Sequence, residues 1–258
     1  MSALGGFALL LGKELREQVR TLRLVVVVAV LAVFGATSPL IAKLLPDIIK
    51  AAGTQSAGLT ITMPPPTTAD AVTQLVKNLG QFGALIAILV SMGAVATEKE
   101  RGTAGFVLTK PVGRGAFIAA KAAAIALLLG AGIAAGYALA WLYTGVLFEV
   151  LPLAGFVASG VLLWLSLLVI GGATFLFSVL ARSSLVAGGA GFVALIVAGI
   201  VAAIPVVGPY MPTALSSPAM ALALGLPAGD VGGPVLVNLV LVCLALGAAG
   251  IAFRRQEL

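Results

Sequence analysis

Long apolar stretches alternate with short polar or proline-containing segments along the whole chain. They cover approximately residues 22–40, 79–97, 122–148, 153–180, 185–204 and 234–253, and none has a charged residue in its middle. A helix that crosses a bilayer needs about 20 predominantly apolar residues. Because glycine interrupts the stretches and they lack the alternation of membrane strands, helices are expected. The pattern predicts an all-α integral membrane protein with six transmembrane helices in a single domain over residues 1–258.

The segment before the first stretch, residues 1–21, has a different periodicity. Its charged residues recur at the spacing of one helix face, and leucine and valine occupy another face; the charged residues are Lys13, Arg16, Glu17 and Arg20. An amphipathic helix of this kind lies in the membrane interface. The alternative is a plain basic anchor that orients the first span. Because no positive residue precedes the apolar run at residues 3–12 and no cleavage site follows it, we expect the segment to be retained rather than removed as a signal peptide.

Basic residues are distributed unequally between the two sides that this topology defines. Lys43, Lys50 and Lys77 fall on one side, and the other 12 of the 15 Lys and Arg residues fall on the side that holds both termini. Cytoplasmic loops of membrane proteins carry the excess of Lys and Arg. Both termini are therefore predicted to lie in the cytoplasm, in the plasma (inner) membrane of a prokaryote. The same bias accounts for the net charge of +6 without a nucleic acid partner.

Two connecting segments on the opposite, outer side contain most of the prolines. Residues 41–78 include a polar stretch and the run TMPPPTT, which favours an extended chain. Residues 205–233 are apolar, but five prolines interrupt them. Prolines at this density disfavour a straight span. The segment is therefore expected to form short helices in the outer leaflet or a re-entrant hairpin.

Composition narrows the chemistry that the chain can perform. Only 9% of its residues are charged, whereas a soluble domain has roughly a quarter. The chain has no histidine, Cys243 is its only cysteine, and Gly12-Lys13 lacks the other residues of a phosphate-binding loop. We therefore expect no enzyme activity, cofactor or metal in this chain. The spans also lack the ionisable residues on which ion-coupled transporters depend.

Residues 98–121 form the segment with the highest density of charges. The stretch EKER continues the second span, Gly102 can break its helix, and Thr103 can cap a short helix that ends before Pro111. The bias of cytoplasmic loops accounts for the basic residues, but not for the glutamates or for the apolar triplet that begins at Phe106. A short helix with an exposed apolar face between mixed charges is suited to docking a cytoplasmic partner.

Several of these features resemble the membrane subunits of type-2 ABC transporters, the exporter class with six spans per subunit. They are the stretch KELREQVRTLR before the first span, EKERGT with KPVGR following it after the second span, the ARSS turn between the fourth and fifth spans, and the proline-broken segment before the sixth. Within this class the chain is similar to stand-alone permeases, including those associated with maturation of nitrous oxide reductase. The resemblance implies one permease domain with an elbow helix over 1–21, a cytoplasmic coupling loop over 98–121 and an outer re-entrant segment over 205–233.

The resemblance also implies roles for individual residues. The elbow helix would present Lys13, Arg16 and Arg20. The interface with an ATPase would consist of Glu98, Glu100, Arg101, Gly102, Thr103, Phe106, Pro111, Arg114, Arg182 and Ser183, with Ser184 in the same turn.

Partners follow from the same resemblance. It implies two separate cytoplasmic ATPase subunits, which bind ATP and Mg, beneath two permease subunits that are identical or related. Spans two and five of the two permeases would meet around the translocation path. The outer loop over 41–78 is longer than in the shortest members of the family, which leaves room for a periplasmic partner or a substrate gate.

Three functions remain open at this point. The first is an ATP-powered permease, an exporter by class, whose substrate the sequence does not name. The second is a membrane scaffold or assembly factor, which copurification from native membranes without any ATPase would favour. The third is a secondary carrier of an apolar substrate, which transport that survives ATP depletion but not loss of the ion gradient would select.

Overall fold

A computed structural model describes residues 3–53, 64–102 and 113–256, and every regular element within these ranges is helical. Thr103, Phe106 and Pro111, which the resemblance places at the ATPase interface, lie outside the described residues. The helices are α1 (Ala3–Arg20), α2 (Arg23–Gly53), α3 (Thr68–Met92), α4 (Ala96–Glu100), α6 (Arg114–Leu147), α7 (Leu153–Leu180), α8 (Ser184–Val201), the 3₁₀ turns η1 (Gly208–Tyr210) and η2 (Pro212–Leu215), α9 (Ser216–Ala223) and α10 (Gly232–Arg254).

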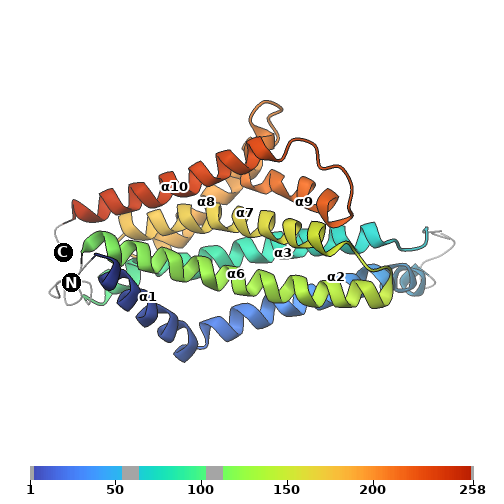
Figure 1. The fold of residues 1–258 in the computed structure, drawn as a ribbon, viewed down its shortest axis with the longest axis horizontal. Coiled ribbons are helices and arrows are strands. Elements are labelled where there is room, and N and C mark those ends of the chain that lie inside the picture. Colours follow the sequence, from blue (N-terminus) through green and yellow to red (C-terminus); the bar gives the residue numbers. More distant parts are fainter. Residues whose placement is uncertain (1–2, 54–63, 103–112, 257–258) are drawn as a thin grey trace.

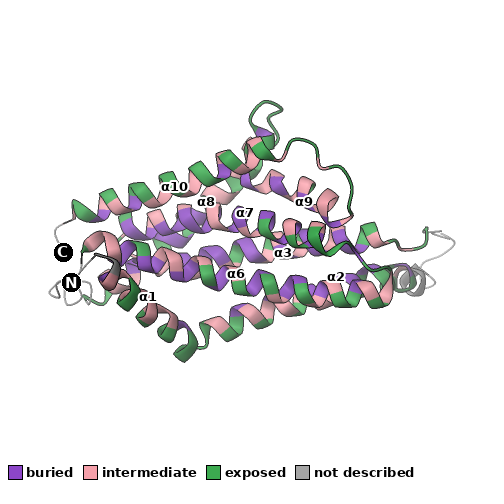
Figure 2. Cartoon of the chain, in the orientation of Figure 1, coloured by how far each residue is buried: buried purple, intermediate pink, exposed green. Residues whose placement is uncertain are grey.

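Six of these elements are long and apolar enough to cross a membrane, counting α3 and α4 as one. They run roughly along one direction, and the two ends of the chain lie at the same end of the bundle, where α1 slants away from it (Figure 1). Helices α3, α6 and α7 carry most of the buried residues, whereas α8 and α10 have few buried residues (Figure 2). The long axis of the bundle thus separates an end that holds both termini and α4 from an end that holds the α6–α7 connection.

Close packing of α2 against α6 depends on glycine. A Cβ atom at Gly35 would lie 2.0 Å from the carbonyl oxygen of Gly136, and one at Gly136 would lie 2.8 Å from that of Leu31. Small residues allow helix backbones to approach in this way where lipid supplies no hydrophobic drive for association. Gly132 and Gly136, a GxxxG pair, therefore pack within one chain.

Four boundaries differ from the predicted spans. Three of them extend beyond the prediction, which counted apolar residues, because helices also continue into polar surroundings; the fourth, the end of α3, comes early because the chain turns at Gly93–Val95. The first helix was expected to end at residue 40, with a loop from 41, but α2 continues through Pro39 and Pro46 to Gly53. The second was expected over 79–97, but α3 begins at Thr68 and ends at Met92. The third was expected from 122, but α6 begins at Arg114, so that part of the expected loop 98–121 is helical.

A local signal in the sequence explains where α3 starts. At the start of α3, the Thr67 N–H donates to the Asp70 carboxylate at 2.9 Å, and the Thr67 hydroxyl accepts from the Asp70 N–H, which is a capping box. The stretches α7, α8 and α10 begin and end close to the predicted bounds. Between α1 and α2 the chain turns at Leu22, which has a φ of 58°.

The connection from α8 to α10 contains the short helical pieces η1, η2 and α9. Asn238, fully buried in α10, donates from its Nδ2 to the carbonyl oxygens of Tyr210 at 3.0 Å and Pro234 at 2.8 Å. This side chain therefore ties the connection to α10.

Candidate functional site

The charged stretch after the second span is attached to α7 at the point where α3 ends. Gly93–Val95 form a turn between α3 and α4, so the helical hydrogen-bond ladder is interrupted there. The N–H groups of Val95 and Ala96 both donate to the Ser178 hydroxyl oxygen at 3.0 Å, and all three residues are buried. A single hydroxyl thus satisfies two buried donors that the break leaves without helical partners.

Two further side chains of α4 bind the junction of α7 and α8. The Lys99 ammonium group donates to the carbonyl oxygen of Val179. The Glu100 carboxylate accepts from the Ser184 backbone N–H at 2.9 Å, and the Ser184 hydroxyl lies 3.2 Å from its second oxygen. Since Ser184 is the first residue of α8 and the Ser183 side chain makes no cap hydrogen bond, Glu100 supplies the acceptor at this helix start.

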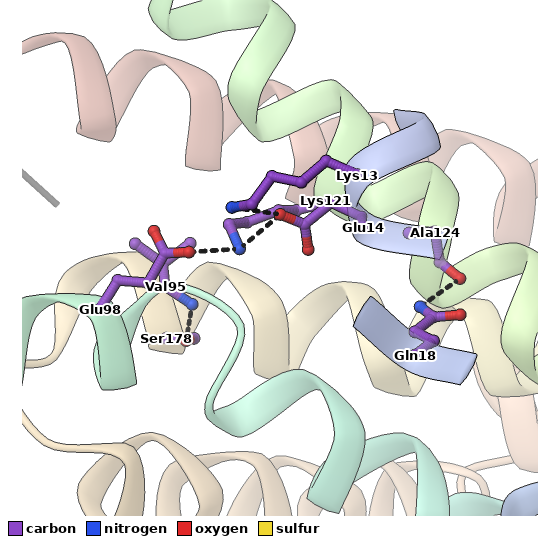
Figure 3. A network of polar contacts seen from close by, with 8 residues as sticks. All are labelled: Lys13, Glu14, Gln18, Val95, Glu98, Lys121, Ala124 and Ser178. Atoms are coloured by element: carbon purple, nitrogen blue, oxygen red, sulfur yellow. Dashed lines mark hydrogen bonds and ion pairs between the residues drawn. The ribbon is translucent and has the colours of Figure 1, made fainter. Parts of the chain in front are cut away.

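On its other side, α4 forms an ion pair with a buried lysine of α6. Lys121 is only 6% exposed, and its Nζ lies 2.8 Å from a carboxylate oxygen of Glu98 and 3.1 Å from one of Glu14 on α1. Figure 3 shows Lys121 pointing between the two carboxylates, with Lys13 reaching the same oxygen of Glu14 at 3.8 Å. Three elements therefore meet at one cation.

A hydrogen bond one helical turn further along α1 strengthens this contact. The buried side chain of Gln18 donates to the carbonyl oxygen of Ala124 on α6 at 3.0 Å (Figure 3). Glu14 and Gln18 are four residues apart on α1, and Lys121 and Ala124 are three apart on α6. The two contacts thus hold α1 against α6 over a full turn of each helix.

The C-terminal segment closes the same end of the molecule. Arg114 at the start of α6 donates to the carbonyl oxygens of Arg254 and Gln256 at 3.0 Å. The Gln256 amide donates to the carbonyl oxygen of Val179 at 2.9 Å, next to the α4 contacts. Helices α4, α6, α7, α8 and α10 are therefore joined by polar contacts at this end.

A cavity of about 260 Å³ lies between α1, the end of α3 and α6. Charged residues of both signs line it, together with apolar residues of α3 and α6; the charged ones are Glu14, Glu17, Arg23, Glu98, Arg101 and Lys121. Within the described residues, no three His, Cys, Asp or Glu side chains are grouped so that they could hold a metal ion. The polar residues at this end instead form a network of contacts that connects different helices.

The structure brings together some of the residues that the sequence singled out. Glu98, Glu100 and Arg114 lie at one end of the bundle, where they bind Lys121, Ser184 and the carbonyl oxygens of the C-terminal segment, respectively. The turn at Arg182 and Ser183 comes directly before Ser184, so it lies at the same end. Gly102 has a φ of 66°, as a residue that ends a helix often does, and both it and Arg101 are exposed. The residues expected on the elbow helix, Lys13, Arg16 and Arg20, are on α1 and exposed.

Other residues of this network were not predicted from the sequence. The charge bias of cytoplasmic loops was taken to account for the basic residues of 98–121, Lys121 among them, but the structure buries Lys121 between Glu98 and Glu14. Ser178, Gln18 and Gln256 were not singled out because their partners are distant in the sequence. Of these three, Ser178 has a local signal, because it is a polar residue near the end of an otherwise apolar helix.

Comparison with known proteins identifies a family whose model matches most of this chain. Residues 8–226 match the family described as ABC-2 family transporter protein. The chain is also 28% identical over 150 residues to an uncharacterized transmembrane protein of Bacillus subtilis, YxlG. That match covers 58% of this chain and 58% of the length of the relative.

Proposed function

Because the chain belongs to the ABC-2 family of transporter membrane proteins and its described residues include six helices able to cross a membrane, we propose that it is a permease subunit driven by a separate ATPase. Its substrate would move across the membrane, outward by analogy with the exporter class, while the partner binds and hydrolyses ATP with Mg. The observation that carries this proposal is the attachment of α4 to α6, α7 and α8. A displacement of α4 would therefore be transmitted to several membrane-spanning helices at once.

The surface available to the ATPase would be the exposed part of this end. Arg101, Gly102 and Arg182 are exposed there, and Ser183 is partly exposed. The resemblance adds Thr103, Phe106 and Pro111, which lie outside the described residues, to the proposed interface. Glu98 and Glu100 have contacts within the chain. We therefore propose that these two residues transmit the displacement of α4 to other helices, in addition to any contact that they make with the ATPase.

The proposed assembly contains two ATPase subunits and two permease subunits, in the plasma (inner) membrane of a prokaryote. The end that holds both termini would face the cytoplasm, since most Lys and Arg residues lie there. An extracytoplasmic partner would bind the opposite end, where the start of α3 and the connection between α8 and α10 lie.

The proposal is tested by copurification followed by ATPase measurement. The tagged chain, extracted from native membranes, is expected to recover a cytoplasmic ATPase that hydrolyses MgATP. Glu98→Lys places a second cation beside Lys121, and Glu100→Lys removes the acceptor at the start of α8, so each is expected to uncouple hydrolysis from conformational change in the permease.

Glu149→Lys is the matched control because Glu149 is an exposed glutamate at the opposite end, between α6 and α7. It is expected to leave hydrolysis and coupling unchanged. Unchanged coupling in both Glu98→Lys and Glu100→Lys would refute the role assigned to α4. A chain that recovers no ATPase from native membranes would favour the scaffold instead.

A further inference from the structure

This inference rests on the proposed function: the geometry indicates that a displacement of α4 is transmitted to the rest of the chain by two separate routes. We propose that Glu98 moves α6 and α1 through Lys121, and that Glu100 moves α8 through Ser184. Lys121, Glu14 and Ser184 are then positioning residues, which act through other elements and touch neither substrate nor nucleotide.

The two routes leave α4 in different directions. Residues of an α-helix are separated by about 100° around its axis, so Glu98 and Glu100 lie about 200° apart. Their contacts agree with this spacing, because Glu98 binds α6 whereas Glu100 binds the start of α8. One short helix can therefore act on two elements at once.

The first route depends on the burial of Lys121. A buried cation separated from its carboxylates would be left without compensation, which is strongly unfavourable. A displacement of Glu98 is therefore expected to take Lys121 with it, and Lys121 in turn holds Glu14. Because Gln18 also binds Ala124, α1 is attached to α6 at two points and follows the same motion.

The second route depends on the exposure of α8. This helix buries few of its residues within the chain, so packing inside one permease subunit restrains it less than α6 or α7. Its first N–H group is bound by Glu100 on α4, a contact between elements that are 84 residues apart in the sequence. A displacement of α4 is therefore expected to shift the start of α8 directly.

Two nitroxide probes distinguish these routes in the complex with its copurified ATPase. Cys243, the exposed natural cysteine, is first replaced by serine. One probe is attached at Leu9 on α1 and the other at Ile200 on α8, because both side chains are well exposed. Addition of MgATP with vanadate to the otherwise unchanged complex is expected to alter the spectra of both probes.

Glu14→Gln weakens the first route at its last step, because it removes the charge with which α1 binds Lys121, while Lys121 keeps Glu98 as its partner. It is expected to reduce the response at Leu9 at least twofold and to leave the response at Ile200 unchanged. Lys121→Met is also expected to reduce the response at Leu9 and to leave that at Ile200 unchanged. Lys121→Arg keeps the charge, so it is expected to retain part of the response at Leu9. Glu149→Gln is the control, since it makes the same chemical change at an exposed glutamate of the opposite end, between α6 and α7.

Ser184→Pro cuts the second route with little change to the helix. Proline is favoured in the first turn of a helix and has no N–H group, and Ser183 has the extended backbone that a following proline requires. The variant is expected to reduce the response at Ile200 at least twofold and to leave that at Leu9 unchanged.

The outcomes separate this inference from the proposed function. Glu14→Gln and Ser184→Pro could each reduce the responses of both probes equally, or reduce neither. In either case the division into two routes is wrong, although ATP still drives the permease. If the complex without these route substitutions shows no response at either probe, the proposed function itself fails. Should Lys121→Met not fold, Glu14→Gln alone decides the first route, because it leaves the buried cation paired with Glu98.

Discussion

At the break between α3 and α4, two adjacent backbone N–H groups share one acceptor. Val95 and Ala96 are fully buried and both donate to the hydroxyl oxygen of Ser178. A buried donor without a partner costs about 1–3 kcal/mol. This hydroxyl therefore stabilises the turn that sets the direction of α4.

Ser178→Ala is expected to destabilise the protein, because it removes the acceptor of two buried donors, each worth about 1–3 kcal/mol if left unsatisfied. The melting temperature of the detergent-solubilised protein measures the effect. Ser166→Ala, at another buried serine of α7, is the matched control and is expected to cause a smaller decrease. An equal decrease in both variants would show that the Ser178 contacts contribute nothing beyond serine packing.

The sequence indicated some of these residues but not their partners. The glutamates at 98 and 100 stood out because a positive bias does not explain acidic residues. Lys121 was interpreted as part of that bias, since nothing local distinguishes a cation near headgroups from one buried between carboxylates. Its partner Glu14 is 107 residues away, so only the packing of α1 on α6 brings the two charges together.

At the level of elements, the predicted helices were found because apolar length is a property of the sequence alone. Their ends were harder to predict, since a helix continues wherever its backbone hydrogen bonds are satisfied. The start of α3 had a readable signal in the sequence TTAD, where Thr67 and Asp70 form the capping box. The continuation of α2 through Pro39 and Pro46 had none, because each proline argued for a stop.

Helix packing also gives a prediction for glycine. Gly35→Ala is expected to displace α2 from α6, because its Cβ would lie 2.0 Å from the carbonyl oxygen of Gly136, and no side-chain rotation relieves a backbone contact. Overpacking costs about 1–3 kcal/mol, occasionally more. The yield of monodisperse protein in size-exclusion chromatography is expected to fall.

Gly189→Ala in α8 is the control for this substitution. Nothing lies within 4 Å of a Cβ atom at Gly189, so the same chemical change adds a methyl group in open space. Alanine also has the higher helix propensity. A yield for Gly35→Ala equal to that of Gly189→Ala would contradict the tight packing of α2 on α6.

At the scale of the whole molecule, both termini, α4 and the α7–α8 turn lie at one end of the bundle (Figure 1). Most of the basic residues lie at the same end, so the charge bias and the fold agree on a common side. Attachment of an ATPase, the direction of transport and the role of α4 all require that this end faces the cytoplasm. The orientation is therefore the prediction on which the others depend.

Cysteine labelling tests the orientation with two positions at opposite ends of α7. This helix has 28 residues, about 42 Å at about 1.5 Å per residue, which is enough to cross a bilayer. In a Cys243→Ser background, a membrane-impermeant maleimide is expected to label Glu149→Cys in intact cells and Arg182→Cys only in inverted vesicles. Both side chains are exposed in the chain, so access depends on the side of the membrane. Labelling of Arg182→Cys in intact cells would place α4 outside, where no cytoplasmic ATPase can reach it.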